Sequence, residues 1–309
     1  MFDCERILRQ AVQRIEPTAT QKAGASRSHN FLRDLLETGN MARVVSESYL
    51  SGSYARDTAV VPLDDVDIIF LVQPEHWQDG LASLFGTKPS PKAVLATFAN
   101  AIRRRYDQSS VYIQRRSVRL SLNHLDIDAV PALRSTRDGD TILIGDVTTD
   151  SWIESAPKKH EAIASRLNAS RGNNFKPLVK LLKGWNANLP STANLKGFAI
   201  ETMAARIFST YSFTSLQEGL KDFFDFVCYL GGAGTIYTWN NGCGMSFGWL
   251  NRVVPDTAGT GSNLIANVEG VRITRLVEHA ARSRNKIIEA ENSSYQDTAE
   301  RRLAEALRF

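Results

Sequence analysis

Apolar residues recur every three to four positions over residues 3–15, which is the spacing of an amphipathic helix, and the pattern stops at Pro17. A second helix is expected to follow and to end near Glu37. The start of the chain is therefore predicted to be helical, with one break at the proline.

Two segments further along have the character of β-strands. Residues 44–50 (VVSESYL) mix β-branched with polar residues, whereas residues 66–72 are apolar on both faces once Asp67 has passed. The pair Gly52-Ser53 lies between the two segments and has the composition of a turn. The predicted order here is strand, turn, strand.

The remainder of the first half alternates between loop, helix and strand. Spaced Gly, Ser and Pro residues predict a loop over residues 74–91, and a helix is expected to follow through Arg104. Three β-rich runs come next, over residues 111–114, 118–122 and 125–130. We therefore expect a mixed α and β first half.

From Lys158 onward helical periodicity dominates, interrupted by a glycine-rich break over residues 231–246. The predicted helices cover residues 175–189, 198–209, 216–230 and 268–290. This change of pattern places a domain boundary between residues 150 and 170.

Composition indicates a globular chain. The 309 residues are 43% hydrophobic, enough for a sizeable core, and the net charge is +4. Three cysteines occur singly, so neither a disulfide framework nor a thiolate zinc site is indicated. No apolar run is long enough to span a bilayer, and the N-terminus lacks a signal-peptide core. We expect a cytoplasmic protein with no membrane partner.

The candidate chemistry begins with acidic residues at the mouth of the apolar strand. Side chains two apart on a strand share a face, so Asp65 and Asp67 project together while Val66 and Ile68 point into the core. Asp64 points the other way and is expected to have a structural role in the turn before the strand. Two adjacent carboxylates repel each other unless a cation neutralises them, and a site with oxygen ligands alone suits Mg²⁺.

A third carboxylate is expected from a neighbouring strand. In the run HLDIDAVPAL, Asp126 and Asp128 share one face and Leu125 and Ile127 share the other. Carboxylates on adjacent strands are what a two-metal site for phosphoryl or nucleotidyl transfer requires, with ions roughly 3.5 to 4 Å apart. Two Mg²⁺ ions are therefore the predicted cofactor, with Mn²⁺ as an alternative.

The turn supplies a place for phosphates. Gly52 has no side chain and lets an anion approach the backbone, and Ser53 offers a hydroxyl and an N–H. A Gly-Ser pair is uninformative by itself, and so is an Asp-x-Asp pair. Their conjunction points to a triphosphate site.

These motifs resemble a known family. Gly52-Ser53, then Asp65-Val66-Asp67, then the run DAVPA from Asp128 look like the nucleotidyltransferase superfamily, and more narrowly like the bacterial cyclic-oligonucleotide synthases, the CD-NTases. The helix LVKLLKGWN and the segment LKGFAIE are similar to landmarks of that branch. The resemblance implies an α+β fold, in which a polymerase-β-like core, a mixed sheet flanked by helices, packs against a mainly helical C-terminal lobe.

The resemblance also implies a division of the chain and roles for its parts. Residues 1–160 would form the catalytic core, with the N-terminal helix crossing to the other lobe as an open alternative, and residues 161–309 would form a lobe like that of the oligoadenylate synthases. Asp65, Asp67 and Asp128 would hold the metal ions, with Asp128 nearest the acceptor hydroxyl.

The same resemblance implies the residues that hold the nucleotide. Gly52 and Ser53 would hold the donor phosphates, and Lys183 would reach the triphosphate. Lys180, three residues earlier on the same helix, is the weaker candidate. A lysine beside an apolar helix face often only lays its stem along that face, so both assignments depend on the resemblance. Gly197 stands where relatives often carry a hydroxyl, which removes one expected phosphate contact.

The implied activity is Mg²⁺-dependent synthesis of a cyclic di- or trinucleotide from ATP and a second nucleoside triphosphate, with release of pyrophosphate. The product would activate a separate effector in bacterial anti-phage signalling. Two alternatives remain open: a transferase that acts on RNA or protein, and a module that senses nucleotide or nucleic acid without turnover. The complete carboxylate triad argues against the second. The arginine clusters leave a nucleic-acid activator open.

Overall fold

The computed structural model describes residues 4–39, 41–77, 88–232 and 242–308. The chain divides into two compact units. The sheet unit is Pro17–Glu161, and the helical unit combines Met1–Glu16 with Ala162–Phe309. Residues 1–16 thus belong with the second half of the chain.

The sheet unit begins with helix α2 (Ala19–Thr38), whose first turn carries a complete capping box between Thr18 and Gln21. The other helices described in this unit are α3 (Gly52–Ala55), the 3-10 helix η1 (Pro74–His76) and α5 (Pro91–Arg103). The strands are β1 (Val45–Ser51), β2 (Asp65–Val72), β3 (Ser110–Ile113), β4 (Val118–Leu122), β5 (Leu125–Arg134), β6 (Ile142–Asp146) and β7 (Ser151–Ser155).

In the described part of this unit, the seven strands form one mixed sheet with the order β1-β2-β5-β4-β3. Strands β2 and β5 run parallel, and the other pairs are antiparallel. The long strand β5 pairs with β4 along its first half and with β6 along its second half, and β7 adds to β6. The parallel pair therefore lies inside the sheet, between β1 and β4.

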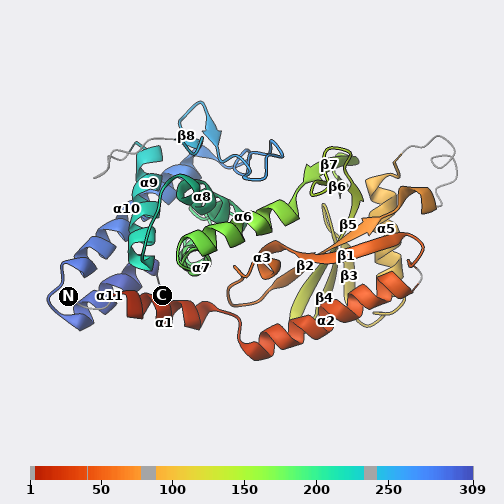
Figure 1. Ribbon diagram of the computed structural model, residues 1–309, viewed down its shortest axis with the longest axis horizontal. Helices are drawn as coiled ribbons and strands as arrows, with labels where there is room; N and C mark the ends of the chain where they lie inside the picture. The colour runs from red at the N-terminus through yellow and green to blue at the C-terminus, as the bar shows by residue number, and fades with distance from the viewer. Residues whose placement is uncertain (1–3, 40, 78–87, 233–241, 309) are drawn as a thin grey trace. The chain divides into compact units, whose positions relative to one another are not determined.

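The two faces of the sheet differ in chemistry. Helices α2 and α5 cover one face, and their apolar side chains share a core with Val66, Ile68 and Phe70 of β2 and with the matching residues of β4 and β5 (Figure 1). The alternate residues of β2 point to the opposite face. There Ile69 and Leu71 form a smaller apolar cluster with residues of β5 and β6. The acidic residues that precede them on β2 lie on this second face.

The helical unit contains α1 (Cys4–Ile15) and the elements that follow residue 161. These are the rest of α6 (Pro157–Ser170), then α7 (Phe175–Ala187), α8 (Gly197–Thr210), α9 (Leu216–Leu230), α10 (Gly270–Glu291) and α11 (Gln296–Leu307). A small hairpin joins β8 (Ser246–Phe247) to β9 (Arg252–Val253). Trp185 is fully buried at the centre of this unit, where its ring packs edge-on against Phe224 at 4.8 Å.

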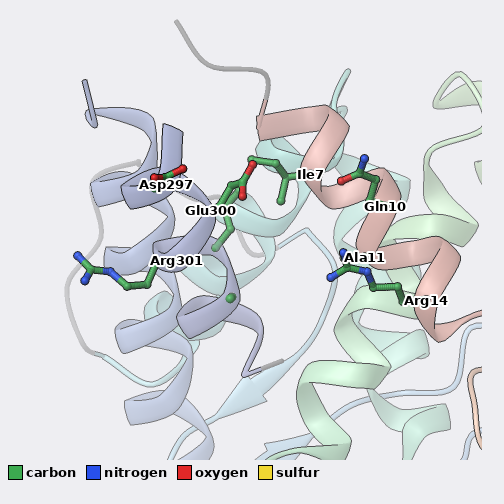
Figure 2. A pocket seen from close by; sticks show the side chains of 9 residues that line it. Ile7, Gln10, Ala11, Arg14, Asp297, Glu300 and Arg301 are labelled. Atoms are coloured by element: carbon green, nitrogen blue, oxygen red, sulfur yellow. The ribbon is translucent and has the colours of Figure 1, made fainter. Parts of the chain in front are cut away.

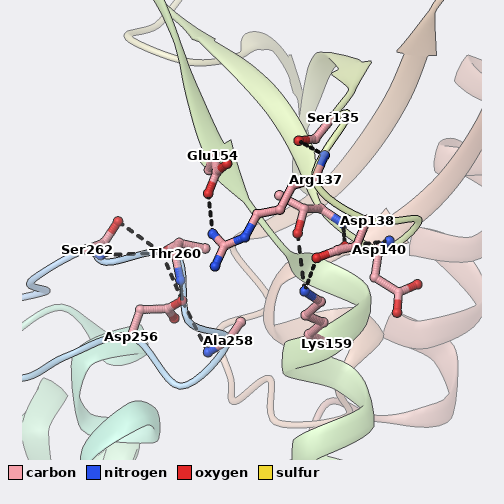
Figure 3. A network of polar contacts seen from close by, with 11 residues as sticks. Ser135, Arg137, Asp138, Asp140, Glu154, Lys159, Asp256, Ala258, Thr260 and Ser262 are labelled. Carbon is pink, nitrogen blue, oxygen red and sulfur yellow. Dashed lines mark hydrogen bonds and ion pairs between the residues drawn. The ribbon is translucent and has the colours of Figure 1, made fainter.

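Most predicted elements are present, and several that were not predicted are added, among them β6, β7, α6 and α11. Helix α6 lacks a strong periodic pattern and buries only Ala164 and Leu167. Contacts at its start hold α6 in place. Lys159 donates to Asp138 at 2.7 Å and to Thr141 at 3.2 Å (Figure 3). The loop predicted over residues 74–91 lies partly outside the described residues.

No helix in the described part of the chain combines the length and the apolar character that crossing a bilayer requires. The three cysteines, Cys4, Cys228 and Cys243, are all buried.

Candidate active site

The parallel pairing of β2 and β5 brings the predicted carboxylates together. Asp65 lies opposite Asp126, and Asp67 lies opposite Asp128. Neighbouring strands are about 4.8 Å apart, so four acidic side chains crowd onto the second face of the sheet within two rungs of the ladder. Asp128 is 5% exposed and Asp65 is partly exposed. The three residues predicted as metal ligands are therefore neighbours in this fold.

The turn after β1 fits closely against this acidic cluster. Gly52 has φ +69°, a conformation that glycine adopts without strain. A Cβ atom at this position would lie 1.9 Å from Oδ2 of Asp67. Ser51 also pairs with Asp67 in the β1–β2 ladder. Only a glycine lets the turn pass this close to the carboxylate.

The same crowding alters the acidity of Asp67. Burial, followed by the negative charges of Asp65 and Asp128, raises the pKa of Asp67 to about 7. The positive charges of Arg56 and Arg119 act in the opposite direction but do not cancel these effects. Arg56 is 6% exposed, and its backbone N–H donates to the carbonyl of Gly52 at 3.3 Å. The backbone of Arg56 therefore ends the short helix that begins at Gly52.

Arg119 is a site residue that the sequence motifs do not single out. It lies on β4 directly opposite Asp128. Its Nε and Nη2 donate to Oδ1 and Oδ2 of Asp128 at 2.9 and 2.6 Å, and its Nη1 donates to Oδ2 of Asp126 at 3.0 Å. Nη2 also lies 3.5 Å from Oδ2 of Asp65. The hydrogen bonds that it donates to Asp128 raise the pKa of Arg119 above its ordinary value.

A signal for Arg119 was present in the sequence. Only Asn123 and His124 separate the runs predicted at 118–122 and 125–130, and a two-residue hairpin sets the register of its strands. The observed hairpin pairs Leu122 with Leu125, which places Arg119 opposite Asp128. Asp126, which shares a strand face with Asp128, accepts a hydrogen bond from this arginine.

The donor set suits Mg²⁺ in type, since every candidate ligand is a carboxylate oxygen. Burial and the neighbouring carboxylates raise the pKa of Asp67, and a bound cation would act against both effects. As the side chains stand, however, no three acidic, histidine or cysteine side chains within the described ranges converge closely enough to hold an ion. Arg119 engages both oxygens of Asp128. The residues present therefore fit the metal in the type of their donor atoms, and Arg119 contacts the carboxylate of Asp128 that would help to hold it.

The two candidate lysines of α7 have different surroundings. Lys180 is 3% exposed and forms an ion pair with Glu16 at 2.7 Å inside the helical unit. Lys183 is half-buried, and a Cβ at Gly197 would lie 3.1 Å from its Cε. The glycine at the start of α8 thus makes room for the stem of Lys183. Lys180 has the surroundings of a structural residue, and Lys183 is the better candidate for binding phosphate.

A separate groove lies between α1 and α11 of the helical unit (Figure 2). Its volume is about 440 Å³, and its walls mix apolar with charged side chains. The lining residues are Ile7, Gln10, Ala11, Arg14, Asp297, Glu300, Arg301, Leu303 and Ala304. None of the predicted site residues is among them.

Comparison with known families identifies the chain. The model of the Second Messenger Oligonucleotide or Dinucleotide Synthetase domain matches residues 3–168, which is more than half of the sequence. The chain belongs to this family. The match includes the turn, the acidic cluster and Arg119. The predicted relationship to the bacterial CD-NTases is thereby confirmed.

A curated relative agrees with this assignment. A cyclic AMP-AMP-AMP synthase from an Acinetobacter species is 32% identical over 233 residues, which are 70% of this chain and 64% of that protein. The matched region is thus less than two thirds of that relative's length. The activity in its name is that of the Acinetobacter protein.

Two solved structures share the fold along nearly the whole chain. Escherichia coli CdnC, determined with ATP, has a TM-score of 0.76 at 17% identity and covers 98% of this chain and 97% of its own. Bradyrhizobium diazoefficiens CdnG, determined with GTP, has a TM-score of 0.72 at 14% identity, with 100% and 99% covered. The predicted fold class, a mixed sheet flanked by helices with a helical C-terminal region, is confirmed.

Proposed function

We propose that this member of the synthetase family is an Mg²⁺-dependent nucleotidyltransferase that makes a cyclic di- or trinucleotide. The observation that carries the proposal is the register of β2 and β5, which sets Asp67 beside Asp128 and against the Gly52 turn. This arrangement supports placing the donor triphosphate at the turn and the acceptor hydroxyl at the carboxylates.

Each residue then has a task. The backbone N–H and hydroxyl of Ser53 bind donor phosphate oxygens, and Gly52 keeps that approach open. Lys183 adds a positive charge to the triphosphate. The acceptor hydroxyl oxygen attacks the α-phosphorus, its proton passes to Asp128, and the bond to pyrophosphate breaks in line. Asp65 and Asp67 orient the reacting groups from the other strand.

Two Mg²⁺ ions held by Asp65, Asp67 and Asp128, with Mn²⁺ as an alternative, would supply charge neutralisation at the attacking and leaving oxygens. The protein contributes the shape of the site. Because Asp67 pairs with Ser51 on one side and with Asp128 on the other, the sheet fixes the spacing of these ligands.

ATP is the first substrate to test. The name of the Acinetobacter relative, cyclic AMP-AMP-AMP synthase, supports ATP as donor and a cyclic trinucleotide as one candidate product. A second nucleoside triphosphate remains part of the proposal. Nucleoside triphosphates are abundant in the cytoplasm, so the proposal puts the reaction there, with the product activating a separate effector in anti-phage defence.

The test is incubation of the purified protein with each radiolabelled nucleoside triphosphate and Mg²⁺, followed by phosphatase treatment and mass spectrometry. We expect a phosphatase-resistant cyclic product that is absent from the double variant Asp65→Ala, Asp67→Ala. If all four nucleotides together give no such product, with or without duplex DNA or RNA as activator, the proposal is wrong. Label transferred to RNA or protein would instead indicate a macromolecular acceptor.

A further inference from the structure

A single guanidinium spans the acidic cluster. Arg119 donates to both oxygens of Asp128, to Asp126, and lies within ion-pair distance of Asp65. Asp128 is 5% exposed, so it has little access to water, and Arg119 places a positive charge directly against it. A two-pronged pair of this kind is among the strongest side-chain contacts available.

This contact conflicts with metal binding at Asp128. Mg²⁺ binds carboxylate oxygens at about 2.0–2.1 Å. An ion on Oδ2 of Asp128 would share that oxygen with Nη2 of Arg119, which lies 2.6 Å away. The ion and the guanidinium would then be within roughly 5 Å of each other, where like charges repel strongly. One cation must give way to the other.

The surroundings of Arg119 indicate that its side chain can move while the backbone of β4 stays in place. Its neighbours Val118 and Leu120 are fully buried in the core beneath the sheet, which fixes the backbone of β4. The side chain of Arg119 is 21% exposed, so it has an outlet to solvent. Asp126 holds Nη1 at 3.0 Å and provides an anchor about which the guanidinium pivots off Asp128.

We propose that Arg119 is a positioning residue that acts as an internal counter-ion: it holds Asp128 in the metal-free protein and leaves it when a metal-nucleotide complex binds. This inference rests on the proposed function. The triphosphate offers the displaced guanidinium a new anionic partner, whereas a free metal ion offers none. The site therefore binds metal weakly alone and tightly together with nucleotide.

The test measures metal binding directly, by the electron paramagnetic resonance signal of free Mn²⁺ titrated into the protein without nucleotide. We expect Arg119→Gln to lower the Kd for Mn²⁺ by about tenfold relative to wild type, because a cation within a few ångströms changes a carboxylate's affinity for a proton by at least that factor and should oppose a metal ion in the same way. Arg119→Lys keeps a charge but loses the two-pronged contact, and its Kd should fall between the two.

Arg115→Gln is the matched control. Arg115 forms an ion pair at 2.8 Å with Asp146, a buried carboxylate in the same sheet unit. Removing this charge should leave the Kd for Mn²⁺ unchanged. Addition of a non-hydrolysable ATP analogue should strengthen Mn²⁺ binding in the wild type and have a smaller effect in Arg119→Gln, because the guanidinium is already gone.

The outcomes separate the inference from the proposed function. A Kd for Arg119→Gln equal to that of wild type, or weaker, overturns the counter-ion role. If Asp67→Asn still weakens Mn²⁺ binding in that case, the metal site itself stands. Should Arg119→Gln fail to fold, an unchanged Kd for Arg119→Lys overturns the role equally. Absence of Mn²⁺ binding in every form, with or without the analogue, counts against both.

Discussion

Gly52, at the end of β1, lies directly against the carboxylate of Asp67. A methyl group on residue 52 would lie 1.9 Å from Oδ2 of Asp67. The contact joins the two halves of the proposed site, because the turn that receives phosphates rests on a residue that receives metal. A change on either side is expected to disturb the other.

Gly52→Ala is predicted to reduce product formation by at least about a hundredfold, since displacement of reacting groups by about 1 Å has effects of that size. It combines a left-handed backbone with a direct clash. The control is Gly259→Ala, where φ is +74° and nothing lies within 4 Å of the added Cβ. That variant should lose only about 1–2 kcal/mol of stability and keep its specific activity. Equal activity losses in both variants would contradict the explanation that a side chain at residue 52 is excluded by the contact with Asp67.

The raised pKa of Asp67 predicts a pH dependence of stability in metal-free protein. The pKa is about 7 in the folded chain and 3.8 for an unperturbed aspartate, so the folded chain binds an extra proton between these values. The stabilisation is complete below about pH 4 and is lost as the pH rises through 7. Asp67→Asn should therefore become more stable relative to wild type as the pH increases from 5 to 8.

Thermal unfolding in EDTA at several pH values measures this effect. Between pH 5 and the pKa of about 7 the linkage amounts to about 2.7 kcal/mol, so we expect the Tm difference between Asp67→Asn and wild type to increase by about 5–10 °C. A difference that is constant with pH would refute the prediction, as would one that falls.

Variants of Lys180 and Lys183, both on α7, should show different defects. Lys183→Met is predicted to raise the KM for ATP by about tenfold or more through loss of a charged phosphate contact, with little change in Tm. Lys180→Met removes the buried partner of Glu16 and should lower stability by about 1–3 kcal/mol while leaving the KM for ATP nearly unchanged. Steady-state kinetics and thermal unfolding of both variants provide the comparison. Interchanged phenotypes would reverse the two assignments.

Gly197 should influence binding through Lys183. A serine at this position would place its Cβ 3.1 Å from Cε of Lys183 and force the lysine stem to shift. We expect Gly197→Ser to raise the KM for ATP by about twofold to fivefold, because a small displacement of one charged contact costs about 0.5–1 kcal/mol. In the Lys183→Met background the same serine should add little. Additive effects in this double-mutant cycle would show that Gly197 acts by another route.

The sequence by itself determined the local features of this protein. Alternation along β2 placed Asp65 and Asp67 on one face and their neighbours in the core, because successive side chains on a strand point to opposite sides. The ligand types, the glycine turn and most of the helices were readable in the same way. The two-residue hairpin even contained the register that pairs Arg119 with Asp128.

Tertiary structure alone decided which distant segments meet. The parallel pairing that sets Asp67 beside Asp128 and the ion pair of Lys180 with Glu16 join residues far apart in the chain. Local periodicity follows from backbone geometry, which a few neighbouring residues reveal. Long-range pairing follows from the summed packing of many weak contacts over a whole unit, and no short stretch of sequence contains that sum.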